Sequence, residues 1–197
     1  MYAPASPPDT PTRDRILGIS RELFSVYSYA EVSLAAIARE AGVSTTLIIK
    51  LFQSKERLFE ETVDFSTSAQ ALFAGDFADL GRTAVQETLS APFTAPYSMI
   101  RTLSVTGGSA DSLSAIGRRI TTDILEVLTR RIATEAPHPH PGPGLRAQSA
   151  VALLTGLSLM RRVGDTEFSA CDRAELHRHY ARLMQEIIDG SATPEVQ

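Results

Sequence analysis

The chain of 197 residues has one cysteine, no tryptophan and only two lysines. A single cysteine, Cys171, cannot form an internal disulfide or a cysteine-rich zinc site, so a disulfide-stapled secreted scaffold is excluded. The longest apolar stretch, 150–160, contains polar residues and is well short of the roughly 20 residues that span a bilayer. The N-terminal residues show no basic segment followed by an apolar run, so we expect no signal peptide and a cytoplasmic location.

Strand patterns are also missing, since no run alternates apolar and polar β-branched residues. Apolar residues recur instead at three-to-four spacing, and the 43% hydrophobic content suffices for a core. The sequence therefore predicts an all-α protein of about nine helices. We expect them at 12–28, 34–41, 45–53, 55–73, 79–90, 96–105, 110–135, 145–163 and 172–189, with a Pro- and Gly-rich loop at 137–144.

Charge is distributed unevenly along the chain, although the net charge is −4. Residues 12–58 carry seven basic and five acidic side chains, a balance of +2, whereas the chain from residue 59 carries 12 basic and 17 acidic ones, a balance of −5. Both lysines, Lys50 and Lys55, lie in the first segment. This segment is the candidate for contact with a polyanion.

Residues 34–53, LAAIAREAGVSTTLIIKLFQ, have the internal spacing of a helix-turn-helix. Ser33 and Ser44 are suited to cap the two helices. Gly42 stands where the first helix must end in a left-handed conformation, and the small Ala38 allows the helices to cross closely. An ordinary pair of packed helices is the alternative explanation for this segment.

The second of these helices has two distinct faces. Ile48 and Phe52 form a buried pair, and a rotation of 100° per residue then places Thr46 and Lys50 on the opposite, outward face. In a helix-turn-helix that face enters the major groove. There Lys50 can donate a hydrogen bond to guanine, and Ile49 can contact the methyl group of thymine. The predicted DNA-binding residues are Ser33, Ser44, Thr45, Thr46, Ile49, Lys50 and Lys55.

Lys55 directly follows Ser54, the predicted cap of the fourth helix, so it lies in the first turn of that helix. A cation in the first turn opposes the helix dipole, and a neighbouring phosphate would offset that cost. We therefore expect Lys55 to contact the DNA backbone, as opposed to base edges.

With these residues in place, the segment 12–60, from TRDRILGISRELF through AAIAREAGVS to LFQSKERLF, resembles the DNA-binding domain of the TetR family of bacterial transcription regulators. The resemblance implies a three-helix DNA-binding domain at 12–58 and a larger helical domain at 59–190 that dimerises and holds a small-molecule effector. Residues 1–11, which contain four prolines and no helical period, are expected to form a flexible arm, and 191–197 a tail. The resemblance also implies a bacterial regulator that binds a palindromic operator, as a ligand-responsive repressor.

The segment departs from the family pattern at three places. Ser28-Tyr29 replaces the Gly-aromatic pair near the end of the first helix, Ile49 replaces a tyrosine that contacts phosphate, and Leu51 replaces a histidine. Ile49 cannot donate a hydrogen bond. The usual phosphate contact at that position is therefore in question.

The larger domain supplies two further sets of expected residues. A hydrophobic effector would lie among apolar and aromatic side chains of helices 79–163, with Phe93, Tyr97, Met99, Leu103, Ile120 and Ile124 as candidates. The last two helices are expected to pair with their symmetry mates in a four-helix bundle. The expected interface residues are Leu154, Leu157, Leu183 and Ile187.

Other function classes find little support. His177 and His179 are two apart on a helix and point to different faces, while His138 and His140 lie in the proline loop, so no metal or catalytic site is predicted. No Gly-rich phosphate loop or nucleophile elbow is present, and no enzyme activity, cofactor or membrane association is expected. The remaining alternative is a helical ligand-binding or protein-interaction module that does not recognise DNA.

Overall fold

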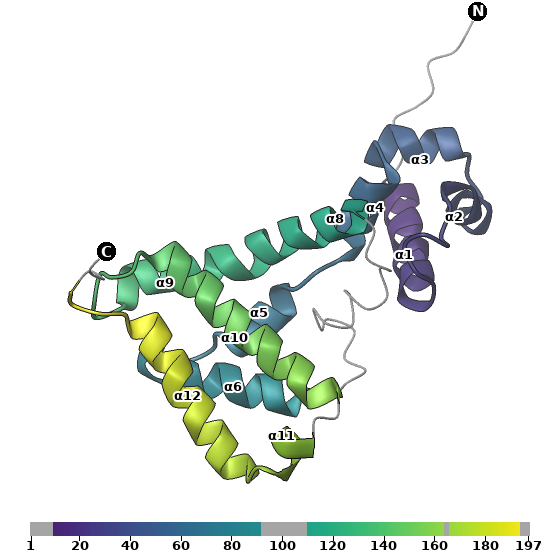
Figure 1. Cartoon of the computed structure of the whole chain (residues 1–197). Helices are drawn as coiled ribbons and strands as arrows, with labels where there is room; N and C mark the ends of the chain where they lie inside the picture. Colours follow the sequence, from purple (N-terminus) through teal and green to yellow (C-terminus); the bar gives the residue numbers. More distant parts are fainter. Residues whose placement is uncertain (1–9, 92–109, 164–165, 194–197) are drawn as a thin grey trace, which may run out of the picture. The chain divides into compact units, whose positions relative to one another are not determined.

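The computed structural model describes residues 10–91, 110–163 and 166–193 (Figure 1). These residues are mostly helical and contain no β-strand apart from an isolated bridge between His140 and Ser191, which confirms the all-α fold. The chain divides into two compact units. Of the described residues, the first comprises 10–63 and 110–118, and the second comprises 64–91, 119–163 and 166–193.

The first unit is a small bundle. It contains α1 (Thr10–Val26), α2 (Leu34–Ala41), α3 (Thr45–Phe52), α4 (Lys55–Thr62) and most of α8 (Ala110–Ile120). α1 packs against α2 and α4, and α3 packs against the same two helices. Its core consists of large apolar side chains at the predicted three-to-four spacing: Ile16, Phe24, Ile37, Ile48, Phe52, Leu58 and Phe59.

The helix boundaries in this unit follow the predicted capping signals. The Oγ of Ser33 accepts a hydrogen bond from the N–H of Ala36 at 3.0 Å, and Ser44 and Ser54 cap α3 and α4 in the same way. α2 ends at Gly42, whose φ of 65° is the left-handed conformation that glycine adopts without steric cost. The three predicted caps and the predicted stop are confirmed.

The helix predicted at 55–73 is wrong, because the structure breaks it into α4 and α5 (Ser66–Leu72). Val63 has extended backbone angles, and the Asp64 carboxylate accepts a hydrogen bond from the N–H of Ser66 at 2.8 Å. A short polar side chain that bonds to nearby backbone competes with helix continuation. The N–H of Phe65 donates to the Asp123 carboxylate at 3.0 Å, so the break is also held by a distant residue.

The second unit is the larger bundle. It contains α5, a 3-10 helix (Phe77–Asp79), α6 (Leu80–Ser90), a π-helical segment (Thr121–Leu125), α9 (Glu126–Glu135), α10 (Pro143–Val163), α11 (Thr166–Ala170) and α12 (Arg173–Asp189). α6 packs against α5, α10 and α12, and α10 packs against α9 and α12. Apolar side chains from α5, α6, the π-helical segment, α9, α10 and α12 form its core, among them Ala69, Leu80, Val85, Ile124, Leu128, Ile132, Leu154, Met184 and Ile188.

α6 and α12 approach each other closely at Gly81. A Cβ at this position would lie 2.4 Å from the carbonyl oxygen of Ala181 and 2.7 Å from the backbone nitrogen of Gln185. The Gly81 N–H also donates to the Gln185 side-chain oxygen at 2.8 Å. Glycine is therefore required here by the distance between the two backbones.

Several expected boundaries shift. The helix predicted at 110–135 is present, but it is α-helical in α8 and α9 and π-helical between them. α10 begins at Pro143, two residues early, which a proline in the first helical position tolerates. α11 was not predicted, and the helix predicted at 96–105 lies outside the described residues. Of the helices in the described ranges, not one has the length and hydrophobicity needed to cross a membrane.

Candidate nucleic-acid interface

α2, the turn after it and α3 form the helix-turn-helix predicted from the sequence. The N–H of Val43 donates to the carbonyl oxygen of Ala38 at 3.0 Å across the left-handed Gly42, which closes the end of α2. Ser44 then caps α3 directly, so only Gly42, Val43 and Ser44 separate the two helices. This short, fully hydrogen-bonded turn fixes the angle at which α3 leaves α2.

α3 has a buried face and an exposed face. Ile48 and Phe52 are 1% and 2% exposed, whereas the side chains of Thr46 and Lys50 are exposed on the opposite side, as predicted. Ile49, beside Lys50, is 51% exposed. Thr46, Ile49 and Lys50 thus form one outward surface of α3, which we call the α3 outer face.

The family comparison agrees with this geometry. A model of bacterial regulatory proteins of the tetR family matches residues 16–62. The N-terminal domain belongs to the TetR family. The chain is therefore a DNA-binding transcriptional regulator, and the alternative of a helical module that does not recognise DNA is not favoured.

Solved structures of TetR-family regulators share the fold of the whole chain. A TetR-family regulator of Streptomyces coelicolor is 23% identical, with 94% of this chain and 99% of that chain covered and a TM-score of 0.57. NalD of Pseudomonas aeruginosa, the secondary repressor of the MexAB-OprM multidrug efflux pump, is 24% identical over 88% and 93% of the two chains, with a TM-score of 0.54. The reduced form of Escherichia coli NemR is 17% identical over 89% and 96%, with a TM-score of 0.58. Comparison with curated proteins gives no match.

Ser33 and Ser44 of the TetR-type domain cap helices and also keep a hydroxyl group that can donate a hydrogen bond. The Oγ atoms of Ser33 and Ser44 accept from backbone N–H groups, and both side chains remain exposed. Each hydroxyl therefore keeps its own hydrogen as a donor. Thr45, beside Ser44, is half-buried at the start of α3. Hydroxyl donors at helix N-termini are well placed for phosphate oxygens.

Lys55 has partners inside its own unit. Its ammonium group donates to the carbonyl oxygen of Tyr29 and lies 4.2 Å from the centre of the Tyr29 ring. Burial lowers the pKa of Lys55, and the nearby Asp111 opposes that shift. The contact with Tyr29 explains how a cation is accommodated in the first turn of α4 without a phosphate. The DNA contact of Lys55 stays a prediction.

Tyr29 itself sits in an aromatic cluster. Its ring centre lies 6.0 Å from that of Phe24 and 5.2 Å from that of Phe59, and Phe24 and Phe59 meet edge to face at 4.9 Å. The family departure at Ser28 is also accommodated, since the Ser28 hydroxyl and N–H both donate to the Glu31 carboxylate, at 2.7 and 2.8 Å. Tyr29 is thus a core residue that positions Lys55.

Gln53 is the residue at which α3 ends, and its side chain is exposed. Its φ of 70° is unusual for a residue other than glycine, and the Ser54 N–H donates to the Phe52 carbonyl oxygen across it at 2.8 Å.

The residues predicted for effector and dimer contacts fare differently. Phe93, Tyr97, Met99 and Leu103 lie outside the described residues, while Ile124 is 1% exposed in the core of the second unit and Ile120 is half-buried. No observation tests whether these side chains hold an effector, so that set stays a prediction.

The predicted dimer residues need a correction. Leu154 and Leu157 are 3% and 2% exposed, because they face the core of their own bundle, so they have no surface to offer a partner. Leu183 and Ile187 are half-buried. The opposite side of α10 instead exposes a row of apolar and small residues at spacings of seven, four, three and four, which we call the α10 stripe: Leu145, Ala152, Gly156, Leu159 and Val163.

Proposed function

We propose that this TetR-type regulator is a ligand-responsive repressor that binds a palindromic operator as a homodimer. The α3 outer face is the observation that carries the proposal. It presents a base-edge donor, Lys50, beside a hydroxyl and an apolar side chain, on the second helix of a capped helix-turn-helix. That combination suits the donor, acceptor and methyl pattern of the major groove.

The α10 stripe supports the homodimer. One recognition helix contacts too few base pairs for specificity, and a two-fold dimer places two such helices on half-sites one or more turns apart. Leu145, Leu159 and Val163 are 57%, 47% and 63% exposed on one side of α10. Exposed apolar side chains in a row at helical spacing favour a helix-to-helix contact between two copies.

Repression and ligand response are supported by analogy and by the second unit. NalD, which has the same fold, is described as a repressor. The second unit is a helical bundle with its own core and α10 on its surface, and pockets between bundled helices are frequent ligand sites. A small effector, expected from the sequence to be largely hydrophobic, would release DNA by binding better to the form that cannot span both half-sites.

Selection of bound sequences from a random DNA library tests the DNA-binding part of the proposal. We expect a palindromic site whose affinity falls steeply with salt. Lys50→Ala is expected to weaken binding to the selected site by about 1–3 kcal/mol and to relax its sequence preference at one position per half-site. Arg82→Ala, an exposed arginine of the second unit, is the matched control and should leave preference unchanged. A selection that yields only single, non-palindromic sites would contradict the proposal.

Sedimentation velocity at micromolar concentration tests the dimer. The wild-type chain should sediment as a dimer, and Leu159→Glu, which puts a charge into the α10 stripe, should sediment as a monomer. Leu113→Glu is the control, because Leu113 is also an exposed leucine, at 44%, but lies on α8. A wild-type monomer, or equal loss of dimer in both variants, would refute the assignment of the interface to α10.

A further inference from the structure

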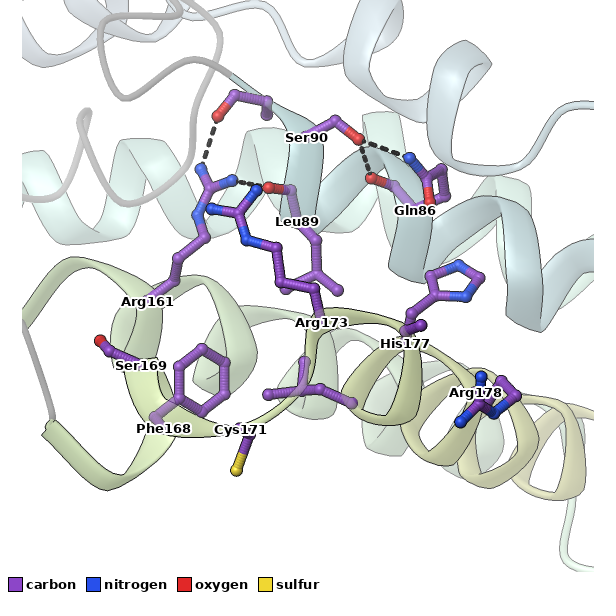
Figure 2. A pocket seen from close by; sticks show the side chains of 13 residues that line it. Gln86, Leu89, Ser90, Arg161, Phe168, Ser169, Cys171, Arg173, His177 and Arg178 are labelled. Atoms are coloured by element: carbon purple, nitrogen blue, oxygen red, sulfur yellow. Dashed lines mark hydrogen bonds between the residues drawn. The ribbon is translucent and has the colours of Figure 1, made fainter.

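The second unit contains a cavity at the meeting point of four helices (Figure 2). Its volume is about 1090 Å³, and its described lining comes from the last turns of α6, the end of α10, α11 and the first turns of α12. The cavity is neither fully enclosed nor a flat surface, so a small molecule can enter it. Ile120 and Ile124, the two predicted effector residues that the structure describes, are not among its described lining.

The charged groups among the described lining residues are all of one sign. Arg161, Arg173, Arg178 and His177 contribute guanidinium or imidazole groups, and not one of the described lining residues is an aspartate or glutamate. The same lining includes apolar surface from Leu89, Phe168 and Leu176. Two guanidinium groups in one cavity repel each other, and an anion bound between them would offset that repulsion. A carboxylate or phosphate is therefore the kind of group that this lining suits.

Arg161 projects from the end of α10 onto the end of α6. Its guanidinium donates to the carbonyl oxygens of Leu89 and Ala91, which are the last acceptors of α6. Burial lowers the pKa of Arg161, and repulsion from Arg162 and Arg173 lowers it further. A cation at a helix C-terminus is favourable. The carbonyl groups of Leu89 and Ala91 thus account for the position of Arg161. They do not account for the presence of a second arginine, Arg173, in the same cavity.

Arg173 is that second arginine, and it lies in an unfavourable place. It is the first residue of α12, where the helix dipole disfavours a cation. The neighbouring carboxylate of Asp172 is engaged in capping α12, since it accepts from the N–H groups of Ala174 and Glu175. Within the described ranges, no carboxylate lies within ion-pair distance of Arg173, and in Figure 2 its side chain extends toward Arg161 and the end of α6.

We propose that this cavity binds a small organic anion with an apolar body, whose carboxylate or phosphate group lies between the guanidinium groups of Arg161 and Arg173. The apolar body packs against Leu89, Phe168 and Leu176. The inference rests on the proposed function, because it identifies the effector class and the place where the effector binds. It also revises the sequence-based expectation, since an effector of this kind needs a charged group as well as a hydrophobic part.

The position of the cavity offers a route to regulation. Its walls include the end of α10 and the start of α12, and α10 carries the stripe proposed for the dimer contact. An anion that draws Arg161 and Arg173 together favours one spacing of these helix ends over another. A ligand shifts an equilibrium only by its differential affinity, so a difference in this spacing between the two dimer forms is what the ligand would detect.

Three probes separate the contributions of charge and apolar surface: decanoate, decanol and acetate. By calorimetry, decanoate should bind the wild-type chain, and decanol and acetate should each bind at least about tenfold more weakly, since each lacks one half of the recognition. A fourth probe, decyl phosphate, should bind with an affinity similar to that of decanoate. If either of these two anions bound tenfold more tightly than the other, its head group, carboxylate or phosphate, would be identified as the one that the site prefers. Equal affinity for decanoate and decanol would overturn the proposal.

Arg173→Gln is the variant that tests the site, because Arg173 is exposed and its replacement does not remove the contacts at the end of α6. It should weaken decanoate binding about tenfold and leave decanol unchanged, and Arg173→Lys should restore part of the loss. Arg130→Gln, an exposed arginine on α9 away from the cavity, is the control. Equal effects of the two glutamine variants would refute the assignment.

Cys171 provides a second measurement that needs no ligand. It is the only cysteine in the chain, it is exposed, and it lies in the described cavity lining. A dianionic aromatic disulfide should modify it faster than a neutral dipyridyl disulfide, and the ratio of rates should fall with salt and in Arg173→Gln. A ratio unaffected by salt and by the variant would count against a positive cavity.

DNA release separates this inference from the proposed function. If decanoate binds through Arg173 but operator affinity stays the same, the anion site stands and its effector role is refuted. If no anion binds while the dimer still recognises its palindrome with steep salt dependence, the inference fails and the proposed DNA-binding function stands.

Discussion

Replacing Gly81 by alanine is expected to destabilise the second unit, because α6 and α12 meet there backbone to backbone. The added Cβ would lie 2.4 Å from the Ala181 oxygen and 2.7 Å from the Gln185 nitrogen, where ordinary contact is 3.4–4 Å. Both are backbone atoms and cannot rotate away. The two helices must therefore separate by about 1 Å locally, and the surrounding side chains lose close packing.

The magnitude follows from three contributions. Overpacking of this kind costs about 1–3 kcal/mol. The hydrogen bond from the Gly81 N–H to Gln185, 2.8 Å long, contributes about 0.5–1.5 kcal/mol and is stretched when the helices part. Alanine gains up to about 1 kcal/mol in helix propensity, and less at the second residue of a helix. The free energy of unfolding should therefore fall by about 1–3 kcal/mol.

Urea denaturation followed by circular dichroism, at a fixed protein concentration because a dimer's stability depends on it, measures this loss. Gly117→Ala is the matched control, since Gly117 is an exposed helical glycine in α8 with no atom within 4 Å of an added Cβ. It should be unchanged or up to about 1 kcal/mol more stable. If Gly81→Ala proved as stable as Gly117→Ala, the close crossing of α6 and α12 would be refuted.

Two further predictions concern the DNA-binding domain. Lys55→Met should change the free energy of unfolding by less than about 1 kcal/mol, because the contacts with Tyr29 and the desolvation that lowers the pKa of Lys55 oppose each other. The same variant should weaken binding to all DNA sequences equally and reduce the salt slope by about one unit, and a large loss of stability with an unchanged slope would assign Lys55 a structural role alone. Hydrogen bonds from the Ser28 hydroxyl and N–H lower the pKa of Glu31, so its contribution to stability is present above the unfolded-state pKa and is lost as the pH falls through the folded-state pKa. Glu31→Gln should therefore be less stable than wild type at neutral pH and equally stable in strong acid, and a difference that persists in acid would contradict this account.

The structure of the DNA-binding domain was largely predictable because its signals are local. A serine cap, a glycine stop and a three-to-four apolar period each act within one or two turns of helix, so Ser44, Gly42 and the Ile48/Phe52 pair were identifiable without tertiary information. The side of α3 that faces outward followed from the same period. Here local hydrogen bonding and amphipathicity determine the structure.

The contact partner of Lys55 could not be predicted from local patterns. Its position in the first turn of α4 signalled an unusual cation, but its contact with Tyr29 joins residues 26 apart in the chain. No local pattern states which distant carbonyl or ring a long side chain will reach. The break between α4 and α5 is similar, since the Phe65 N–H is held by Asp123, 58 residues away.

In the second unit, the sequence determined that the helices exist, and tertiary packing decided what each face does. α10 is apolar on more than one side, so periodicity alone could not tell that Leu154 and Leu157 belong to its own core while Leu159 and Val163 stay exposed. In the cavity, arginines from the end of α10 and the start of α12 lie close to the end of α6. No spacing of residues in the sequence predicts that these three helix ends are neighbours. Which surfaces become core, interface or cavity depends on contacts between segments distant in the chain, and those contacts exist only in the folded bundle.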